Sequence, residues 1–240
     1  MDLEKETLKR DDDERTKALE ELRVLLGLKE LHRMESFDNS HLFGTFYVGG
    51  MVVFDDFLPN KDLYRKYKIS TEVKDDLSAM REVLYRRYFK TIMDESYKPD
   101  LIVMDGGELQ ISVAKEILNS LNLYIPIIGL VKDKNHRTSY IMNENYERLE
   151  VEKDSKLFLF LTRIQEEVHR YAITYHRNIK AKGALSSLLD AAPGIGEVRK
   201  KELLKHFGSL KKLKEASFEE LETVIGHEIA EKLFSYLKEL

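Results

Sequence analysis

Two short apolar runs constrain the fold of this 240-residue chain more than any other feature. Residues 101–104 and 127–131 are apolar at consecutive positions, a pattern typical of strands buried on both faces. The segment between them opens on Gly106-Gly107 and then carries apolar residues at helical spacing. Strand, helix and strand in this order predict a βαβ crossover, whose two strands run parallel in one sheet.

The sequence on either side of the crossover supplies further strands and helices. Before it come three short segments, rich in aromatic and β-branched residues, whose connections are short enough to require antiparallel neighbours. A helix should follow Lys74, and after the crossover we expect a hairpin and a long helix. The three antiparallel strands are expected over 33–38, 46–54 and 62–69, the hairpin over 139–142 and 148–151, and the long helix over 155–180.

This order of elements predicts an α/β fold, a mixed sheet with helices on its faces, and it is the order of the ribonuclease H-like fold. A lead-in helix, closed by Gly27, should occupy residues 1–30, and the sheet domain residues 31–182. A run of small residues over 183–187 suggests a hinge. Residues 183–240 should form a small all-helical domain.

Composition excludes several classes of protein. The chain has no cysteine, which excludes disulfides, cysteine nucleophiles and thiolate metal sites. No apolar run approaches the roughly 18 residues of a membrane span, and the first residues do not resemble a secretory signal. We therefore expect a cytoplasmic protein without a membrane partner. The formal net charge is −4, but residues 193–214 carry seven basic and two acidic residues, a local charge of +5. This basic segment is either a DNA-binding surface or an ordinary solvated helix surface.

Two aspartates end predicted strands. Asp38 ends the first strand, and Asp105 ends the strand over 101–104. The predicted topology places these strands side by side, so the two carboxylates should point at one spot. Such a pair suits a hard divalent cation, Mg²⁺ or Mn²⁺. Each aspartate also has a structural interpretation, an Asx turn for Asp38 and a helix N-cap for Asp105.

Two further residues could join this pair. Asp76 opens the helix after Lys74, where it either compensates the helix dipole or adds a carboxylate to the metal site. His169 lies in the long final helix beside the core position Val168. It is either a packed residue or the polar group that the closing helix brings to the metal.

Two basic segments are candidate phosphate contacts. The loop over 132–138 follows a buried strand and carries Lys132, His136 and Arg137. In the small domain, Pro193-Gly194-Ile195-Gly196 has the spacing of a helix-hairpin-helix, whose backbone N–H groups can bind a phosphate. The DNA-contacting residues expected there are Gly194, Gly196, Arg199, Lys200 and Lys201.

Eight segments spread over nearly the whole chain match the pattern of one known family. They are 35–41, 51–54, 64–67, 75–76, 80–84, 104–107, 132–138 and 169–177, which read ESFDNSH, MVVF, YRKY, DD, MREVL, MDGG, KDKNHRT and HRYAITYHR. Together they resemble the C-terminal half of UvrC, the incision subunit of bacterial nucleotide excision repair. In that family this half is a ribonuclease H-like endonuclease followed by tandem helix-hairpin-helix motifs, and it cuts DNA on the 5′ side of a lesion.

The resemblance implies roles for particular residues and partners. Asp38, Asp105 and His169 would be catalytic, and Asp76 a further functional carboxylate. Duplex DNA with a lesion would be the substrate, and UvrB, in the complex that UvrA loads, would be a partner. The family's N-terminal half and its UvrB-docking segment have no counterpart here, so we interpret the chain as a fragment or a truncated form.

Two departures from the family pattern qualify this interpretation. Glu108 and Leu109 stand where the family commonly has lysine and glycine. The second hairpin, over 224–228, has one glycine and is shortened by about two residues, so we expect it to pack rather than bind DNA. The predicted function is a divalent-metal-dependent DNA endonuclease. The alternatives are a noncatalytic DNA-binding module on a degenerate nuclease scaffold, and a ribonuclease or recombination nuclease with the same sheet.

Overall fold

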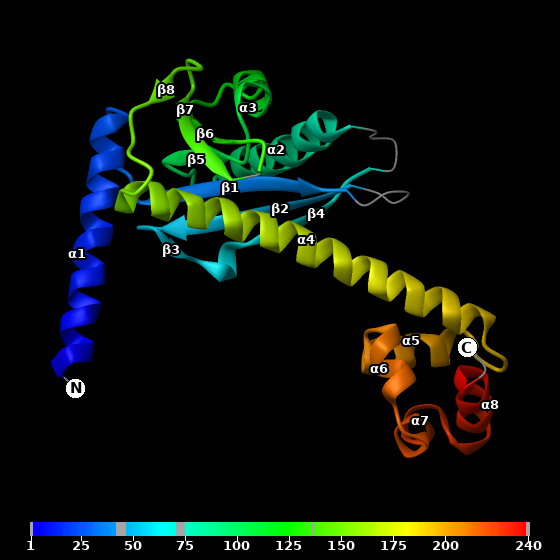
Figure 1. The fold of residues 1–240 in the computed structure, drawn as a ribbon. Coiled ribbons are helices and arrows are strands. Elements are labelled where there is room, and N and C mark those ends of the chain that lie inside the picture. Colours follow the sequence, from blue (N-terminus) through cyan, green and yellow to red (C-terminus); the bar gives the residue numbers. More distant parts are fainter. Residues whose placement is uncertain (1, 42–46, 71–74, 136, 239–240) are drawn as a thin grey trace. The chain divides into compact units, whose positions relative to one another are not determined.

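The fold is described from a computed structural model of the chain, which describes residues 2–41, 47–70, 75–135 and 137–238. The chain divides into two compact units, residues 1–173 and 174–240. The first unit contains an eight-stranded sheet, and the second is helical (Figure 1). None of the described helices is both long and apolar enough to cross a membrane.

The sheet of the first unit has the order β3-β2-β1-β5-β6-β7-β8, with β4 also paired to β2. Strands β1, β5 and β6 run parallel, and the other pairs are antiparallel. The predicted α/β class and the βαβ crossover over β5, α3 and β6 are therefore confirmed. The strands are β1 (Arg33–Ser40), β2 (Val48–Asp55), β3 (Leu58–Pro59), β4 (Arg65–Lys68), β5 (Leu101–Met104), β6 (Ile127–Lys132), β7 (Thr138–Asn143) and β8 (Arg148–Leu149).

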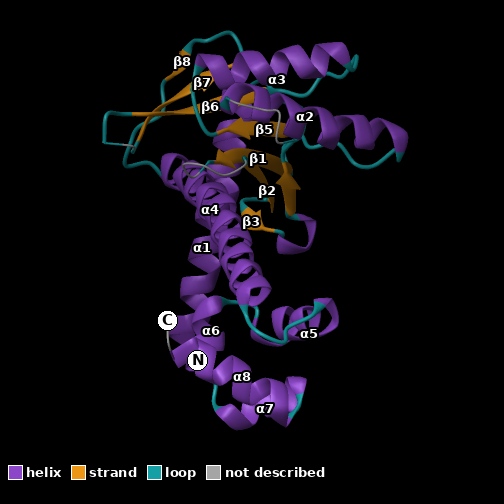
Figure 2. Cartoon of the chain, turned by 90° about the vertical axis from the view of Figure 1, so that its right-hand side faces the viewer, coloured by secondary structure: helices purple, strands orange, loops and turns teal. Residues whose placement is uncertain are grey.

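Helices cover both faces of this sheet. α2 (Asp76–Met93) and α3 (Glu108–Ser120) pack on one face, where residues such as Ile102 and Met104 are buried. α1 (Asp2–Leu25) and the first part of α4 (Lys156–Ala191) pack on the other, against residues such as Leu101 and Val103 (Figure 2). Successive residues of β5 thus face opposite cores, which explains why this strand is apolar throughout.

Two local predictions differ from the structure, and a third falls outside the described residues. Residues 183–187, where a hinge of small residues was expected, are helical, and α4 continues to Ala191 because Leu185 and Leu189 are buried in the helical core of the second unit. The predicted strand over 62–69 is the shorter β4, preceded by a 3-10 turn at Lys61–Leu63. Phe46, the expected first residue of the second strand, lies outside the described residues.

The second unit contains two helix-hairpin-helix turns. The end of α4 and α5 (Glu197–Phe207) flank the first turn, and α7 (Phe218–Ile225) and α8 (His227–Lys238) flank Gly226 in the second. α6 (Leu210–Glu215) connects the two pairs. Leu203, Leu221 and Leu233 are completely buried in the core that the helices share, so this unit has an apolar core of its own.

Candidate active site

The pairing of β1 with β5 brings the two predicted strand-end aspartates together. In this parallel pair Phe37 lies opposite Met104. The next residue along each strand is an aspartate, Asp38 on β1 and Asp105 immediately after β5. The carboxyl ends of adjacent parallel strands meet at one edge of a sheet, which is the edge where α/β proteins bind ligands.

His169 reaches the same edge from α4. On β2, opposite Asp38, stands Gly50, where an added Cβ would lie 3.2 Å from the backbone and side chain of Ala172. The absence of a side chain at Gly50 therefore lets α4 approach the sheet closely, one turn after His169. The His169 Nδ1 atom lies 2.8 Å from Asp38 Oδ2.

Asp38, Asp105 and His169 form a compact cluster of candidate metal ligands. One ligand atom from each lies within 4.8 Å of the others. The Asp105 side chain is 2% exposed and that of Asp38 14%, whereas the His169 ring is 52% exposed. The cluster therefore combines a buried carboxylate with a ring that solvent or substrate can reach.

Asp105 is held by two side chains whose contacts sequence reasoning did not predict. Lys132 Nζ lies 2.8 Å from the carboxylate. Gln165 Nε2 donates to Asp105 Oδ1 at 2.7 Å and to the Leu130 carbonyl at 2.9 Å, and Gln165 Oε1 accepts from the Thr138 hydroxyl. Gln165 is buried, and it precedes His169 by one helical turn. In the sequence, only this spacing indicated that Gln165 lies on the same helix face as the histidine.

The local charges shift two pKa values in the cluster. Burial, reinforced by the charge of Asp38, raises the pKa of Asp105 above its usual range, and Lys132 opposes this shift. The hydrogen bond to Asp38 raises the pKa of His169, although partial burial works against it. A divalent cation would relieve the repulsion between the two carboxylates, and this is the chemistry that the donor set favours.

Asp76 does not join the cluster. It is the exposed first residue of α2, and its backbone carbonyl accepts a hydrogen bond from Asn39 Nδ2 at 3.1 Å. The N-cap role belongs to its neighbour Asp75, which accepts from the Ser78 backbone N–H at 2.8 Å. Asp76 therefore lies next to the strand that carries Asp38, and a functional role for its carboxylate stays a prediction.

The predicted basic loop divides into residues with different surroundings. Lys132 lies at the end of β6, where its ammonium pairs with Asp105. Arg137 is exposed on the loop, and its backbone N–H donates to Asp133 at 3.1 Å. His136 lies outside the described residues.

The first hairpin of the second unit has the backbone geometry that its glycines predict. Gly194 has φ +77°, which side-chain-bearing residues rarely adopt, and Gly196 is the N-cap of α5. Arg199 and Lys201 are exposed in the first turns of this helix. Lys200 pairs with Asp190 at 2.5 Å, and its side chain is only 15% exposed. Arg199 Nη1 donates to the Gly194 carbonyl at 3.3 Å, so among the described residues Lys200 is the only one of the three basic residues that forms an ion pair.

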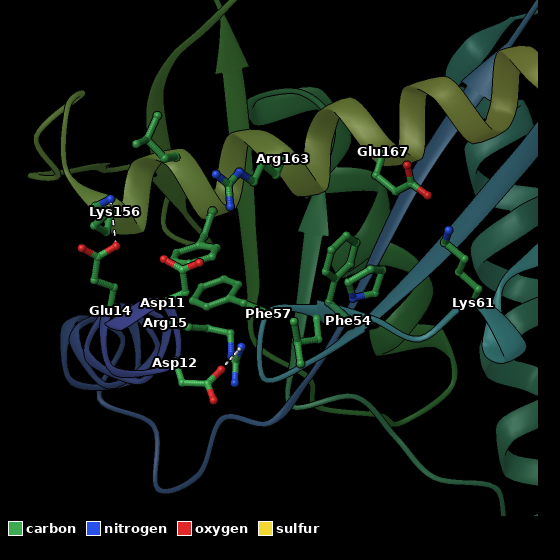
Figure 3. Close-up of a pocket in the computed structure, with 14 residues that line it drawn as sticks. Asp11, Asp12, Glu14, Arg15, Phe54, Phe57, Lys61, Lys156, Arg163 and Glu167 are labelled. Carbon is green, nitrogen blue, oxygen red and sulfur yellow. Dashed lines mark ion pairs between the residues drawn. The ribbon is translucent and has the colours of Figure 1, made fainter. Parts of the chain in front are cut away.

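The first unit also contains a cavity of about 590 Å³, whose lining residues are drawn in Figure 3. Its walls come from α1, from α4, from Phe54 near the end of β2, and from the chain after β2, including Phe57. None of the three clustered residues lines it. The candidate active site is therefore the carboxylate and histidine cluster at the sheet edge, and not this cavity.

Comparisons with known proteins were made for both units. Residues 23–173 match the family described as the UvrC RNase H endonuclease domain, and residues 191–240 match a helix-hairpin-helix motif. Similar solved structures include a Bacillus subtilis endonuclease V, with 15% identity, a TM-score of 0.39 and coverage of 61% of this chain and 82% of that one. Human ENDOV has 12% identity and a TM-score of 0.35, with 62% and 85% covered. An Argonaute of Marinitoga piezophila has 16% identity and a TM-score of 0.30, with 43% and 17% covered.

Proposed function

The chain belongs to the family of the UvrC RNase H endonuclease domain, and on that premise we propose that it is a divalent-metal-dependent DNA endonuclease. We propose further that it makes the incision on the 5′ side of a lesion in nucleotide excision repair. The observation that carries the proposal is the convergence of Asp38, Asp105 and His169 within 4.8 Å at one edge of the sheet.

The cluster suits Mg²⁺ or Mn²⁺. Asp38 and Asp105 would hold the ion through carboxylate oxygens, and His169 would add a nitrogen ligand that Mn²⁺ tolerates better than Mg²⁺. The ion would lower the pKa of a bound water and neutralise charge on the scissile phosphate. Gln165 and Lys132 contact Asp105 and would fix the orientation of its carboxylate, as partners of a metal ligand commonly do.

The contact with Asp38 determines which atom of the His169 ring can react. An ionised carboxylate only accepts hydrogen bonds, so His169 Nδ1 must carry the proton in their 2.8 Å contact. The neutral ring then presents the lone pair of Nε2. This atom can take a proton from the attacking water as a general base, or it can bind the ion.

The second unit would supply a DNA contact of its own, in addition to the carboxylate and histidine cluster. The N–H groups at the start of α5 and the exposed side chains of Arg199 and Lys201 suit a phosphate group, which they would bind without reading the base sequence. Arg137 would add a contact on the sheet domain. UvrB, in the complex that UvrA loads, would be the protein partner, and the cytoplasm the compartment.

A nicking assay on supercoiled plasmid tests the proposal. We expect nicks in Mg²⁺ or Mn²⁺, none in EDTA, and none from the Asp38→Asn variant, while all samples bind duplex DNA. Plasmids with and without lesions, assayed with UvrA and UvrB, test the repair role. DNA binding without nicking under all of these conditions would instead support the noncatalytic module. Equal cutting of matched RNA and DNA duplexes would argue against DNA specificity.

A further inference from the structure

A second cavity in the first unit has a strongly basic lining. It has a volume of about 550 Å³ and lies where β1, β2 and β4 meet the second half of α2. Six of its fourteen lining residues are basic and two, Glu35 and Asp94, are acidic. The basic residues are Arg33, Arg65, Lys66, Arg86, Arg87 and Lys90. We call this cavity the α2 groove.

Part of this positive charge is neutralised in the floor of the groove. Glu35 is 1% exposed, and Arg87 binds it through Nε and Nη2, with the closest contact at 2.6 Å. The Tyr88 hydroxyl donates to the same carboxylate at 3.1 Å. A buried pair with this many hydrogen bonds is satisfied, so its role is to hold α2 against β1. Arg33 likewise pairs with Asp55 at 2.7 Å.

Three cations remain at the mouth of the groove. Arg65 is exposed and donates to the backbone carbonyls of Asp62 and Tyr64, and no carboxylate among the described residues forms an ion pair with it. The Lys90 side chain is 75% exposed, and the one carboxylate that pairs with it among the described residues, that of Asp94, is 3.8 Å away. Arg86 is 46% exposed and pairs with Glu82 at 3.1 Å. Guanidinium and ammonium groups arranged in this way suit phosphate oxygens.

Two other residues that line the groove, Lys66 and Tyr67, do not change the charge that it offers to a phosphate. The Lys66 ammonium lies over the ring of Tyr171 on α4, so its charge belongs to the opposite face of the sheet. Burial raises the pKa of Tyr67 to about 12, so its hydroxyl stays protonated and adds no negative charge to the groove.

The distance from the α2 groove to the carboxylate cluster corresponds to only a few nucleotides of DNA. α2 starts beside Asn39, the neighbour of Asp38, and Arg86 and Lys90 follow Asp76 by about 15 and 21 Å along the helix at 1.5 Å per residue. Arg65 lies closer, because it pairs with Met51, which in turn pairs with Phe37 beside Asp38, a separation of two strand spacings or about 10 Å. At 3.4 Å per nucleotide these lengths equal about three to six nucleotides.

We propose that the α2 groove binds backbone phosphates of the substrate DNA about three to six nucleotides from the scissile bond, through Arg65, Arg86 and Lys90. This contact rests on the proposed function, because it takes DNA as the substrate. It is separate from the cluster and from the hairpin of the second unit, and it would fix which part of the strand enters the active site.

The test measures binding rather than cutting. Arg65→Gln with Lys90→Gln removes two exposed charges, and Arg10→Gln with Lys17→Gln is the control, because it removes one exposed arginine and one exposed lysine from α1. Duplex affinity is measured in EDTA over a salt series. We expect the slope of log affinity against log salt to fall by about two units in the groove variant and to stay constant in the control. Equal slopes in both variants would overturn the proposal.

A second experiment locates the contact on the DNA. Single neutral methylphosphonate linkages are placed along one strand, and affinity for the wild type and the groove variant is compared. We expect linkages about three to six nucleotides from the cut to weaken wild-type binding severalfold and to leave the variant unchanged, since its contact is already lost. Equal weakening of both proteins at every position would contradict the proposal.

These measurements separate the two proposals. A chain that never nicks DNA but loses salt dependence in the groove variant would refute the endonuclease and keep the groove as a DNA contact. A chain that nicks normally, with identical salt slopes in the groove and control variants, would refute the groove alone.

Discussion

The carboxylate and histidine cluster and the first hairpin of the second unit, both proposed to act on DNA, place their charges in opposite ways. In the cluster at the sheet edge, Asp105 is almost completely buried and is held by Lys132 and Gln165. In the hairpin before α5, Arg199 and Lys201 are exposed and act beside backbone N–H groups. At the cluster, a buried charge is stable only with all of its hydrogen-bonding partners in a fixed geometry. At the hairpin, each exposed charge would add a small binding energy that salt screens. Changes at the cluster should therefore be nearly all-or-none, and changes at the hairpin graded.

The largest expected effect comes from Asp105→Asn. The amide keeps the size of the side chain but removes the charge that a cation requires, so nicking should fall by at least about 10²- to 10³-fold. Duplex binding should be unchanged. Plasmid nicking and duplex titration measure the two quantities, with the exposed Asp154→Asn as the matched control. Nicking at the wild-type rate in Asp105→Asn would show that the cluster is not the site of the chemistry.

His169→Ala should have the next largest effect. If the ring is the general base, the nicking rate should fall by about 10²-fold, whereas a packing residue would lower the melting temperature alone. His32 offers a matched control, since its Nδ1 lies 2.9 Å from Asp56 in a similar histidine and aspartate pair outside the cluster. His32→Ala should leave the rate unchanged. His169→Asp should recover part of the activity in Mg²⁺, which prefers a carboxylate to a nitrogen ligand.

The lysines of the hairpin sharpen the contrast between buried and exposed charge. Lys201→Ala should lower the salt slope of duplex binding by roughly 0.9 units, the value for one phosphate contact. Lys200→Ala should lower it less, because Lys200 already pairs with Asp190. Nicking at saturating DNA should be the same for both variants. A larger loss for Lys200→Ala than for Lys201→Ala would mean that DNA displaces Asp190.

The smallest effect concerns stability against pH in the metal-free protein. Because the pKa of His169 is raised in the folded state, its protonated ring stabilises the fold below about pH 6.5, and this contribution is lost as pH rises through the raised pKa. Melting temperature in EDTA should therefore fall slightly more between pH 6 and 8 for the wild type than for His169→Ala. Parallel curves for the two proteins would show that the contact with Asp38 adds no stability.

Much of the fold could be predicted from local patterns. The apolar runs of β5 and β6 and the helical spacing between them were enough for the crossover, because the periodicity of a buried strand differs from that of a helix. The adjacency of β1 and β5, and with it that of Asp38 and Asp105, followed from the order of elements. The hinge predicted at 183–187 was wrong, since burial of Leu185 and Leu189 outweighs the weak helix propensity of Gly183.

The hydrogen-bond and ion-pair partners of the charged residues could not be predicted from local sequence patterns. Asp38 and His169 are 131 positions apart, and Gln165 reaches Asp105 only because one face of α4 packs on the sheet. Lys132 was predicted to bind phosphate, yet it pairs with Asp105. The sequence by itself determined which segments are strands, helices and turns, because those choices depend on neighbouring residues. Only the tertiary structure decided the direct contacts of these charges, such as that of Lys132 with Asp105, because such contacts depend on strand register and on which helix face is buried.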